Sequence, residues 1–526
     1  IMNTLQLILL HTHFLLSLCS FTSVPVIAFS FSNPPTVRIL PRHRRGHCGL
    51  ISKKIVSSSE SGTPSVTNNK RIKSIRMSSN DDADDDASDD EDNAKMIRWA
   101  IVGLGDVCAI KSGPAFYKCH GSTLSAVMRR TPGAARQWIE DNACTLPSDV
   151  VHSIRAFDSV ERMMQEGGSM LDAVYVASPP GAHLENVRQI IKATSTNNNT
   201  TAADEEATNI KAVYVEKPCG RSAWETRAMV RELHNANIEF YPAYVSRAHE
   251  RTGVLRKLLS EDKVCGETVT SIKYKQRGSS FARGLDVDNG SIPWRLNAKE
   301  SGGGLIMDMG CHVLDRLDYL FGPLENVKST VLCKGRGSSS STSASSSSSY
   351  PLVEDYVAMS ATIGECNWSA IDSAGATVEC LWDFSPRVGS SVDDDNNSGQ
   401  DEDVDELIIS GPDGSMRMGG MGAGLPIEIL DSAGQLVKTL EFDAPEHAAQ
   451  PLIQSVVNEL LGGQDGGGGG FESDGKNTLG YSPARADNAM RTSEVLDAVL
   501  GSYYGGRHDE FWTRPETWFG LSKASL

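Results

Sequence analysis

The stretch IRWAIVGLGDVC, residues 97–108, joins a short apolar strand to a glycine-containing turn. In such a turn a first glycine, here Gly103, permits the tight bend, and a second, Gly105, lets a pyrophosphate approach the backbone at the start of a helix. Cys108 stands at the third position, which is usually Gly or Ala. Since the turn directly follows the first strand of an alternating pattern, we predict a dinucleotide site that includes Gly103, Gly105, Asp106 and Val107.

Outward from this stretch, short apolar strands alternate with amphipathic helical segments. This alternation implies right-handed crossovers and a doubly wound parallel sheet, so we predict an α/β Rossmann domain over residues 96–245. Ser222 and Glu225 form a capping-box pattern at the start of one helix. The predicted strands are 97–102, 124–128, 173–177, 212–215 and 238–243, and the predicted helices are 132–142, 159–166, 182–193 and 223–235.

Beyond residue 245 the pattern changes to predicted strands that are separated by turn residues, which is typical of an antiparallel sheet. We predict a second, α+β domain over residues 246–526, with a helix at 307–320. Its predicted strands are 268–276, 355–363, 376–384, 406–410, 427–430 and 435–442. Low-complexity segments at 195–209, 338–349, 393–406 and 462–470 bury too little apolar area to order themselves, so we interpret them as surface loops that carry no chemistry.

Composition excludes several classes of protein. The chain has 526 residues, a formal net charge of −17 and a pI near 5.2. This charge argues against a nucleic-acid partner, because binding to phosphates depends on Lys and Arg. The 11 cysteines form no CxxC pair, which argues against a zinc knuckle and a dense disulfide framework and favours a reducing compartment.

Residues 1–95 have the composition of a targeting presequence rather than of a folded domain. An apolar run follows Met2, the segment 31–80 is basic and rich in Ser, and residues 81–92 form an acidic spacer. This two-part pattern resembles the presequences of algal plastids that lie behind extra membranes, so we expect a plastid location. A secretory signal with a disordered linker, or a mitochondrial presequence, is the alternative. We expect no stable membrane insertion of the mature protein.

Two further segments favour a particular cofactor and place it at one edge of the sheet. Arg129 and Arg130 end the second strand, where an acidic residue would favour NAD and an arginine accommodates the 2′-phosphate of NADP. We therefore predict NADP, the alternative being that both arginines are merely solvated. Ser178, Pro179 and His183 follow the strand at 173–177, at the edge where such folds bind ligands, and His183 either contacts the cofactor or caps a helix.

The segment SGGGLIMDMGCHVLD, residues 301–315, carries the most chemistry. Asp308, His312 and Asp315 fall at i, i+4 and i+7, on one predicted helix face. A metal site is disfavoured because no other His or Cys cluster has ligand spacing. In a purely structural interpretation, Asp308 stabilises the helix start and His312 packs.

Taken in order, residues 103–105, the EKP motif at 216–218, the WR motif at 294–295 and the segment 301–315 resemble the Gfo/Idh/MocA oxidoreductases, the family of glucose-fructose oxidoreductase and inositol dehydrogenase. The resemblance spans nearly all of the chain from Met96. It implies a Rossmann domain, a C-terminal domain with a large, mostly antiparallel sheet, and a homo-oligomer, either dimer or tetramer. It also implies hydride transfer between a nicotinamide and a secondary alcohol or ketone of a sugar, cyclitol or related small molecule.

The same resemblance makes Lys217, Asp308 and His312 the catalytic set. We expect His312 to act as the acid/base, because an unperturbed imidazole with a pKa near about 6.5 suits both directions. Lys217 would donate to the reacting oxygen, and Asp308 would orient His312 or a substrate hydroxyl. The resemblance also allows a cis bond before Pro218.

Three further residues are candidates for the pocket. Glu216 is expected to set local geometry or touch the cofactor, and Trp294 and Arg295 to shape the cofactor or substrate pocket. A non-catalytic dinucleotide-binding regulator and an NAD-dependent glycosidase of the same family are the alternative functions. The intact catalytic set counts against the first of these, and Arg129 with Arg130 against the second.

Overall fold

The computed structural model describes residues 96–197, 210–278, 292–337, 352–385, 403–420, 422–462 and 482–519. The predicted presequence and acidic spacer lie outside these residues, and so does most of each low-complexity segment. Within the described chain, no helix combines the length and apolarity that crossing a membrane requires.

Six parallel strands form the first sheet, in the order β3-β2-β1-β4-β5-β6. This is the strand order of a dinucleotide-binding doubly wound sheet, and it confirms the predicted fold class of the first domain. The strands are β1 (Ile97–Val102), β2 (Ser122–Met128), β3 (Arg155–Phe157), β4 (Ala173–Val176), β5 (Ala212–Val215) and β6 (Glu239–Pro242).

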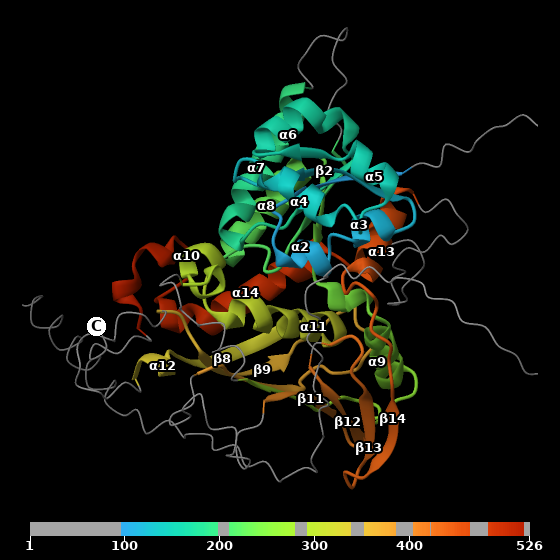
Figure 1. The fold of residues 1–526 in the computed structure, drawn as a ribbon. Coiled ribbons are helices and arrows are strands. Elements are labelled where there is room, and N and C mark those ends of the chain that lie inside the picture. The colour runs from blue at the N-terminus through green and yellow to red at the C-terminus, as the bar shows by residue number, and fades with distance from the viewer. Residues whose placement is uncertain are drawn as a thin grey trace, which may run out of the picture. The chain divides into compact units, whose positions relative to one another are not determined.

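Helices pack on both faces of this sheet, because alternate side chains of each strand point to opposite sides. One face packs against α6 (Val160–Gly167), α7 (His183–Asn197) and α8 (Ala223–Asn235). The other packs against residues of α3 (Ala115–Lys118), α4 (Ala134–Asn142) and α5 (Ser148–Ser153). The short helix α2 (Asp106–Ile110) follows the turn after β1 (Figure 1).

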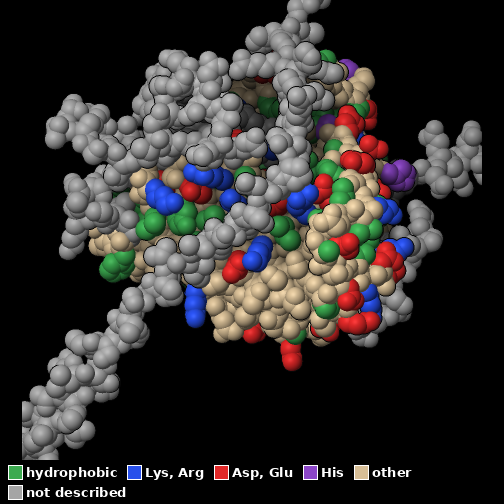
Figure 2. Space-filling model, turned by 90° about the horizontal axis from the view of Figure 1, so that it is seen from below, with side chains coloured by type: hydrophobic (Ala, Val, Ile, Leu, Met, Phe, Trp, Pro, Cys, Tyr) green, Lys and Arg blue, Asp and Glu red, His purple; other side chains and the backbone are tan. Residues whose placement is uncertain are grey.

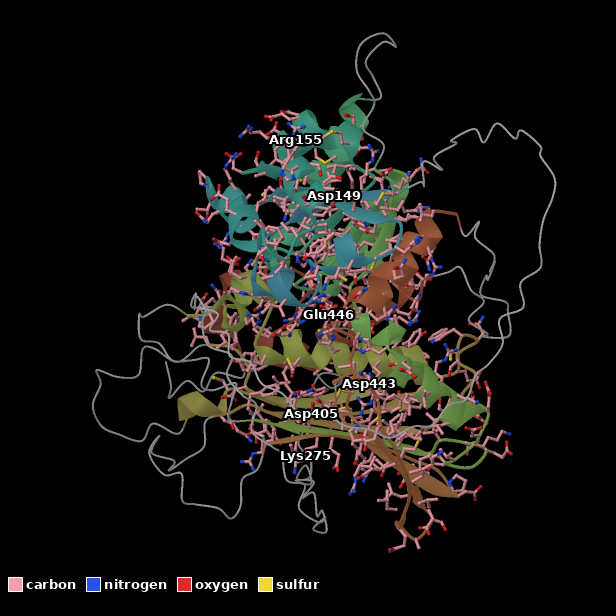
Figure 3. All side chains as sticks on the ribbon, turned by 45° about the vertical axis from the view of Figure 1, so that its right-hand side comes forward. Asp149, Arg155, Lys275, Asp405, Asp443 and Glu446 are labelled. Atoms are coloured by element: carbon pink, nitrogen blue, oxygen red, sulfur yellow. The ribbon has the colours of Figure 1, made fainter. Side chains whose placement is uncertain are left out.

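One helix from the far end of the chain completes this second face. In α13 (Gln450–Leu460), the side chains of Leu452, Ile453 and Val456 are fully buried in the core around Trp99. Glu446, on the segment that leads to α13, accepts a hydrogen bond from Lys118 at 2.6 Å (Figure 3). Although α13 follows the second sheet in the sequence, its apolar side chains therefore pack in the core of the first sheet.

Eight strands form the second sheet, in the order β14-β13-β12-β11-β7-β10-β9-β8. All pairs are antiparallel except β7 with β10, which confirms the predicted mostly antiparallel sheet. The strands are β7 (Ser271–Arg277), β8 (Leu324–Leu332), β9 (Tyr356–Ile363), β10 (Thr377–Asp383), β11 (Val404–Ser410), β12 (Gly414–Gly419), β13 (Ile427–Asp431) and β14 (Leu436–Leu440).

Helices cover the face of the second sheet that is turned toward the first sheet (Figure 1). These are α9 (Glu250–Ser260), α11 (Cys311–Phe321) and α14 (Ala486–Tyr504). The short helices α10 (Ala298–Ser301) and α12 (Lys334–Gly337) lie near α14 and at the end of β8. Because α14 packs against α8 as well as α11, it ties the two domains together.

The opposite face of the second sheet carries the partly exposed side chains of each strand. Along β9, Val357 and Met359 are buried, whereas Ala358 and Ser360 are only half-buried. Figure 2 views the molecule from this side and shows hydrophobic side chains interspersed with charged ones. Among the described residues no helix packs on this face.

Candidate active site

The turn after β1 has the geometry that a dinucleotide site needs. Gly103 has φ +99°, and a Cβ there would lie 2.6 Å from the backbone nitrogen of Ser178, so only glycine fits. A Cβ at Gly105 would meet nothing within 4 Å, which leaves open space for a ligand to approach the backbone. The chain therefore fits a dinucleotide at this turn. The side chains of Asp106 and Val107 lie outside what the structure describes.

Cys108, the unusual third residue of the fingerprint, is buried beneath this turn. Its Sγ donates to the carbonyl oxygen of Gly103 at 3.1 Å. Burial raises the pKa of the thiol to about 12, aided by the charge of Glu216, so the group stays protonated and unreactive. Cys108 thus packs and secures the turn as a small residue would.

Arg129 and Arg130 lie where the sequence predicts, at the end of β2. Both are exposed, and within the described chain neither guanidinium has an ion-pair partner. The backbone nitrogen of Arg129 donates to the carbonyl of Phe157 at 3.1 Å, which fixes the strand end. The two side chains are therefore free to meet a ligand.

The segment after β4 differs from the prediction at His183. Its ring is fully buried, with Nδ1 at 2.8 Å from the carbonyl oxygen of Cys219 and Nε2 at 2.6 Å from that of Ser178. Burial lowers the pKa of the ring, which favours the neutral form, and a neutral ring can donate to only one of these two carbonyl oxygens. Both ring nitrogens nevertheless face the protein backbone, so neither points to the direct cofactor contact that we considered. Ser178 and Pro179 are half-buried at the sheet edge, where Ser178 Oγ accepts from Asn186 at 2.9 Å.

Glu216 is engaged with the protein on both carboxylate oxygens. Tyr175 donates its hydroxyl to Oε1 at 2.5 Å, and the backbone nitrogen of Lys217 donates to Oε2 at 3.1 Å. The Tyr175 hydroxyl is also 3.0 Å from Ser112 Oγ, in the segment after α2. Burial raises the pKa of Glu216 despite the neighbouring Lys217. Its surroundings fit the positioning role that we considered for this residue.

Lys217 and Asp308 meet across the two domains. Lys217 Nζ donates to Asp308 Oδ1 at 2.7 Å and to the Asp308 carbonyl oxygen at 3.0 Å, and the Lys217–Pro218 bond is cis. Burial alone would lower the pKa of Lys217, but the Asp308 carboxylate outweighs it and raises that pKa, so the ammonium stays charged. An ammonium has three N–H groups, so one remains for a ligand.

Asp308 is also held by the WR motif. Its Oδ2 lies 3.1 Å from Arg295 Nε, and the Arg295 guanidinium stacks over the Trp294 ring at 4.4 Å from its centroid. Burial would raise the pKa of Asp308, but Lys217 and Arg295 outweigh it, so this pKa is lowered and the group is ionised. Asp308 therefore orients Lys217 and Arg295, rather than His312 as one of our expectations had it.

His312 lies one helical turn beyond Asp308, beside the edge of the Tyr244 ring at 6.3 Å between ring centroids. Burial, and secondarily the charge of Lys217, lowers the pKa of His312 well below 6.5. The unperturbed pKa that we expected is therefore wrong, and at neutral pH the ring is neutral. Its Nδ1 is buried and has no hydrogen-bond partner among the described residues, and the side chain as a whole is half-buried.

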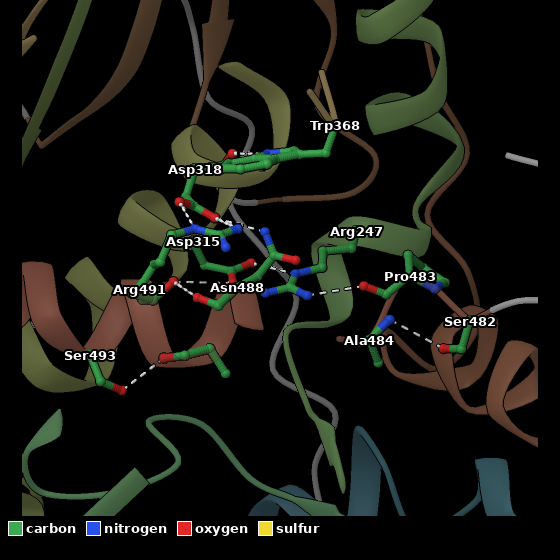
Figure 4. A network of polar contacts seen from close by, with 12 residues as sticks. Arg247, Asp315, Asp318, Trp368, Ser482, Pro483, Ala484, Asn488, Arg491 and Ser493 are labelled. Carbon is green, nitrogen blue, oxygen red and sulfur yellow. Dashed lines mark hydrogen bonds and ion pairs between the residues drawn. The ribbon is translucent and has the colours of Figure 1, made fainter. Parts of the chain in front are cut away.

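Asp315 has different partners from Asp308. Asp308 lies in a π-helical turn (η6, Ile306–Gly310), which winds more widely than the α-helix on which the predicted spacing was counted. Asp315 is fully buried and forms an ion pair with Arg247 (Figure 4). Arg247 also donates to the Pro483 carbonyl at 2.9 Å, so this pair fixes α11 from below the site. Sequence reasoning missed Arg247, which carries no local motif.

The described residues hold no group of three or more His, Cys, Asp or Glu side chains that could bind a metal ion. What they bring together is a glycine turn open to a dinucleotide, an ammonium, an ionised carboxylate and a neutral imidazole. These groups can transfer a proton to or from a substrate while a dinucleotide exchanges a hydride with it.

Two family models match the chain. Residues 97–243 match "Oxidoreductase family, NAD-binding Rossmann fold", and residues 274–380 match "GFO/IDH/MocA C-terminal domain". The chain belongs to the Gfo/Idh/MocA family of oxidoreductases. The resemblance drawn from its motifs is confirmed, and the protein is an NAD(P)-dependent oxidoreductase with an NAD-binding Rossmann domain.

Three proteins that are similar to this chain show how far the likeness extends. Oxidoreductase P35 of Formosa agariphila is 26% identical over 77% of this chain and 99% of its own length. D-xylose 1-dehydrogenase (NADP(+)) 2 of Haloferax volcanii is 26% identical over 33% of this chain and 45% of its own. The structure of aldose-aldose oxidoreductase from Caulobacter crescentus has a TM-score of 0.52 and 19% identity, and the match covers 78% of this chain and 98% of that one.

Proposed function

We propose that this protein is an NADP-preferring oxidoreductase that transfers a hydride between nicotinamide and a secondary alcohol or ketone of a sugar, cyclitol or related small molecule. The contact of Lys217 with Asp308, at the same sheet edge as the open turn at Gly105, is the observation that carries the proposal. It puts a charged donor and a carboxylate next to the predicted nicotinamide edge of the sheet.

The bound dinucleotide would supply the hydride acceptor or donor. Held through Gly103 and Gly105, it leaves the proton to this chain's own residues. His312 is neutral at pH 7, so it accepts the hydroxyl proton when the alcohol is oxidised. The free N–H of Lys217 donates to the same oxygen and stabilises its developing negative charge, in a site where burial strengthens that interaction. Asp308 keeps Lys217 charged and aimed.

Preference for NADP rests on Arg129 and Arg130. Both are exposed at the end of β2 without an internal partner among the described residues, at the position that meets the 2′ group of the ribose. No acidic residue competes for the ribose hydroxyls in residues 125–131. The Haloferax volcanii relative is named as an NADP(+) dehydrogenase, which agrees with this preference.

The experiment is a substrate panel followed at the nicotinamide absorbance. Purified protein is mixed with NADP or NADPH and, in parallel, with NAD or NADH, and with aldoses, anhydrosugars, inositols and dihydrodiols. Turnover of at least one compound with a higher kcat/KM for the phosphorylated cofactor is expected. Tight cofactor binding with no turnover of any compound would favour the non-catalytic regulator. Release of nitrophenol from nitrophenyl glycosides, tested in parallel with NAD and without net cofactor change, would favour the glycosidase.

A second copy of the chain belongs to the proposal as well. The outer face of the second sheet carries Leu381 of β10, half-buried, next to Ala358 and Lys275 on its neighbouring strands. A homo-oligomer that pairs these faces would cover their apolar atoms. Light scattering of the purified protein is expected to give a dimer or tetramer, and Leu381→Glu a smaller species; a wild-type monomer would contradict this part.

The plastid location remains a proposal. It rests on the apolar run after Met2 and the basic, Ser-rich segment that follows. Residues 1–80 fused to a fluorescent reporter are expected to direct it to the plastid of an algal host. Reporter fluorescence in the cytosol, the secretory pathway or the mitochondrion would refute this location.

A further inference from the structure

A single guanidinium joins the two chain segments that present Lys217 and Asp308. Arg507, only 3% exposed, donates through Nη2 to the carbonyl oxygen of Arg221 and through Nη1 to that of Gly302, each at 2.6 Å. Arg221 follows Lys217 by four residues, and Gly302 precedes Asp308 by six. The fork of Arg507 thus bridges the segment that follows the EKP motif and the turn that precedes η6.

The surroundings of Arg507 hold its fork in one orientation. Its Nε donates to Asp497 Oδ1 at 2.8 Å, and the Asp497 Oδ2 accepts from the backbone nitrogen of Ala223 at 2.8 Å, at the start of α8. The Phe511 ring lies under the guanidinium at 4.3 Å from its centroid. Since a planar guanidinium loses little freedom once stacked and paired, it acts as a rigid spacer.

The segment at residues 301–304 is built to accept this bridge. Gly302 has φ +84°, and a Cβ there would lie 2.6 Å from the carbonyl oxygen of Arg221, so the two backbones are in close contact. On its other side, the backbone nitrogen of Gly304 donates to Glu354 at 2.9 Å, and Tyr504 donates to the same carboxylate. The turn is therefore fixed from both sides by residues of the second domain and the C-terminal segment.

We propose that Arg507 is a positioning residue, which sets the separation of Lys217 and Asp308 from outside the reaction centre. The inference rests on the function proposed above. The physical reason is that a hydrogen bond tolerates only a narrow range of distances. The Lys217 Nζ and Asp308 Oδ1 atoms are 2.7 Å apart, so a small shift of either segment would weaken their bond. A displacement on the order of 1 Å, caused by a change far from the chemistry, can cost about 10²-fold in rate.

The test compares Arg507→Ala and Arg507→Lys with Arg514→Ala in the full chain. Arg514 is a matched control, because it lies in the same C-terminal segment and, among the described residues, donates to that segment and the end of α14 and to neither Arg221 nor Gly302. Its Nη1 donates to the Tyr504 carbonyl at 3.0 Å and to Thr517 at 3.5 Å, and its Nη2 to Asp509 at 3.0 Å and to the Gly506 carbonyl at 3.2 Å. Three quantities are measured: the Kd for NADPH by fluorescence, kcat and KM for the panel compound turned over fastest, and amide hydrogen exchange of residues 301–310.

For Arg507→Ala we expect kcat to fall by about 10²-fold with KM and the Kd for NADPH within about 3-fold, and faster exchange at 301–310. Arg507→Lys keeps a positive charge opposite Asp497 but lacks the planar guanidinium that can donate to two carbonyls at once. Its kcat should therefore lie between those of Arg507→Ala and the wild type. Arg514→Ala should match the wild type in all three.

Equal exchange at 301–310 in wild type and both Arg507 variants would overturn the inference, and so would an Arg514→Ala variant as impaired as Arg507→Ala. Should Arg507→Ala fail to fold, Arg507→Lys alone decides, since full activity in that variant contradicts a need for the fork. If wild-type protein turns over no compound, the proposed function fails, while the exchange data still report whether Arg507 fixes the turn.

Discussion

Lys217 and Asp308 are 91 positions apart in the chain, yet Lys217 Nζ lies 2.7 Å from Asp308 Oδ1. One comes from the end of β5 in the first sheet and the other from the turn before α11, which covers the second sheet. Their contact is possible only when the two domains are packed as they are here. The geometry of this pair therefore depends on how the two domains pack against each other.

Lys217→Ala should lower kcat by roughly 10²–10³-fold, because it removes a donor to the reacting oxygen. The Kd for NADPH should change less than about 3-fold, since the glycine turn stays intact. Steady-state kinetics and NADPH fluorescence measure the two effects. Lys211→Ala is the control: Lys211 pairs with Asp172 at 2.9 Å just before the same strand begins, so it should keep wild-type kcat. A Lys217→Ala variant with unchanged kcat would remove this residue from the mechanism.

The depressed pKa of His312 determines the pH dependence of alcohol oxidation. The neutral ring is the proton acceptor, so kcat/KM should rise with pH through the pKa of His312 and then level off. Burial and Lys217 place that pKa well below 6.5. A plot of kcat/KM against pH should therefore show no inflection caused by this group between about pH 6.5 and 8.

The lowered pKa of His312 should also make the free energy of unfolding depend on pH. As the pH drops below about 6.5, the unfolded chain protonates His312 more readily than the folded chain does, because burial lowers the pKa of the ring in the folded state. The free energy of unfolding contributed by this group therefore falls. His312→Gln should weaken that pH dependence in urea titrations, and abolish turnover. His234→Gln, at an exposed position of α8, should do neither. A wild-type stability that is constant between pH 7 and 5, with the same kcat in His312→Gln, would contradict both arguments.

Local patterns predict the parts of the fold in which strand or helix periodicity is strong. The bounds of β1, β5 and α8 match the predictions, because each is a clear apolar or amphipathic run. The strand β3 has only three residues, and β8 has a mostly polar, half-exposed sequence, so neither stood out. The helices α9, α13 and α14 were not predicted either; α14 buries Asn488 and Thr492 among its apolar residues, which blurs its periodicity.

The capping-box prediction at Ser222 is right in position and wrong in its bonds. Ser222 is the N-cap of α8, but its side chain makes no capping bond. Glu225 instead accepts from the backbone nitrogen of Arg221 at 2.8 Å, and Asp497 caps the helix from α14. A tertiary partner has replaced the local one.

Some features of the candidate site could be predicted from the sequence and others could not. The motifs at residues 216–218 and 308–312 could be identified from the sequence, since each motif is contiguous. Arg247 and Arg507 could not, because their partners lie 68 and about 200 positions away. The lowered pKa of His312 could not be predicted from the sequence either, because it depends on burial and on Lys217, which belongs to the other domain.

Arg129 and Arg130 should separate the two cofactors. The double change Arg129→Ala and Arg130→Ala should raise the Kd for NADPH by about 10-fold or more, because hydrogen bonds to a charged phosphate contribute about 1.5–3 kcal/mol each. The Kd for NADH should change less than about 3-fold, since that cofactor lacks the 2′-phosphate. Fluorescence titration gives both values.

Arg136→Ala, an exposed arginine of α4, is the control for overall charge. An equal loss of NADPH affinity in this variant would point to general electrostatic attraction. Equal affinity of the wild type for NADPH and NADH would contradict the preference itself.

The fully buried pair of Arg247 and Asp315 should matter for stability more than any surface ion pair of the chain (Figure 4). Asp315→Asn leaves the Arg247 guanidinium buried without its counter-charge, and breaking such a pair costs about 3–5 kcal/mol of unfolding free energy. Glu494→Gln is the matched control, because it breaks the exposed pair with Arg227 and should cost about 0–1 kcal/mol. The double change Arg247→Met with Asp315→Leu removes both charges, so it should lie closer to wild type than Asp315→Asn does. Urea denaturation measures all four proteins, and an Asp315→Asn variant as stable as Glu494→Gln would show that the pair does not support α11.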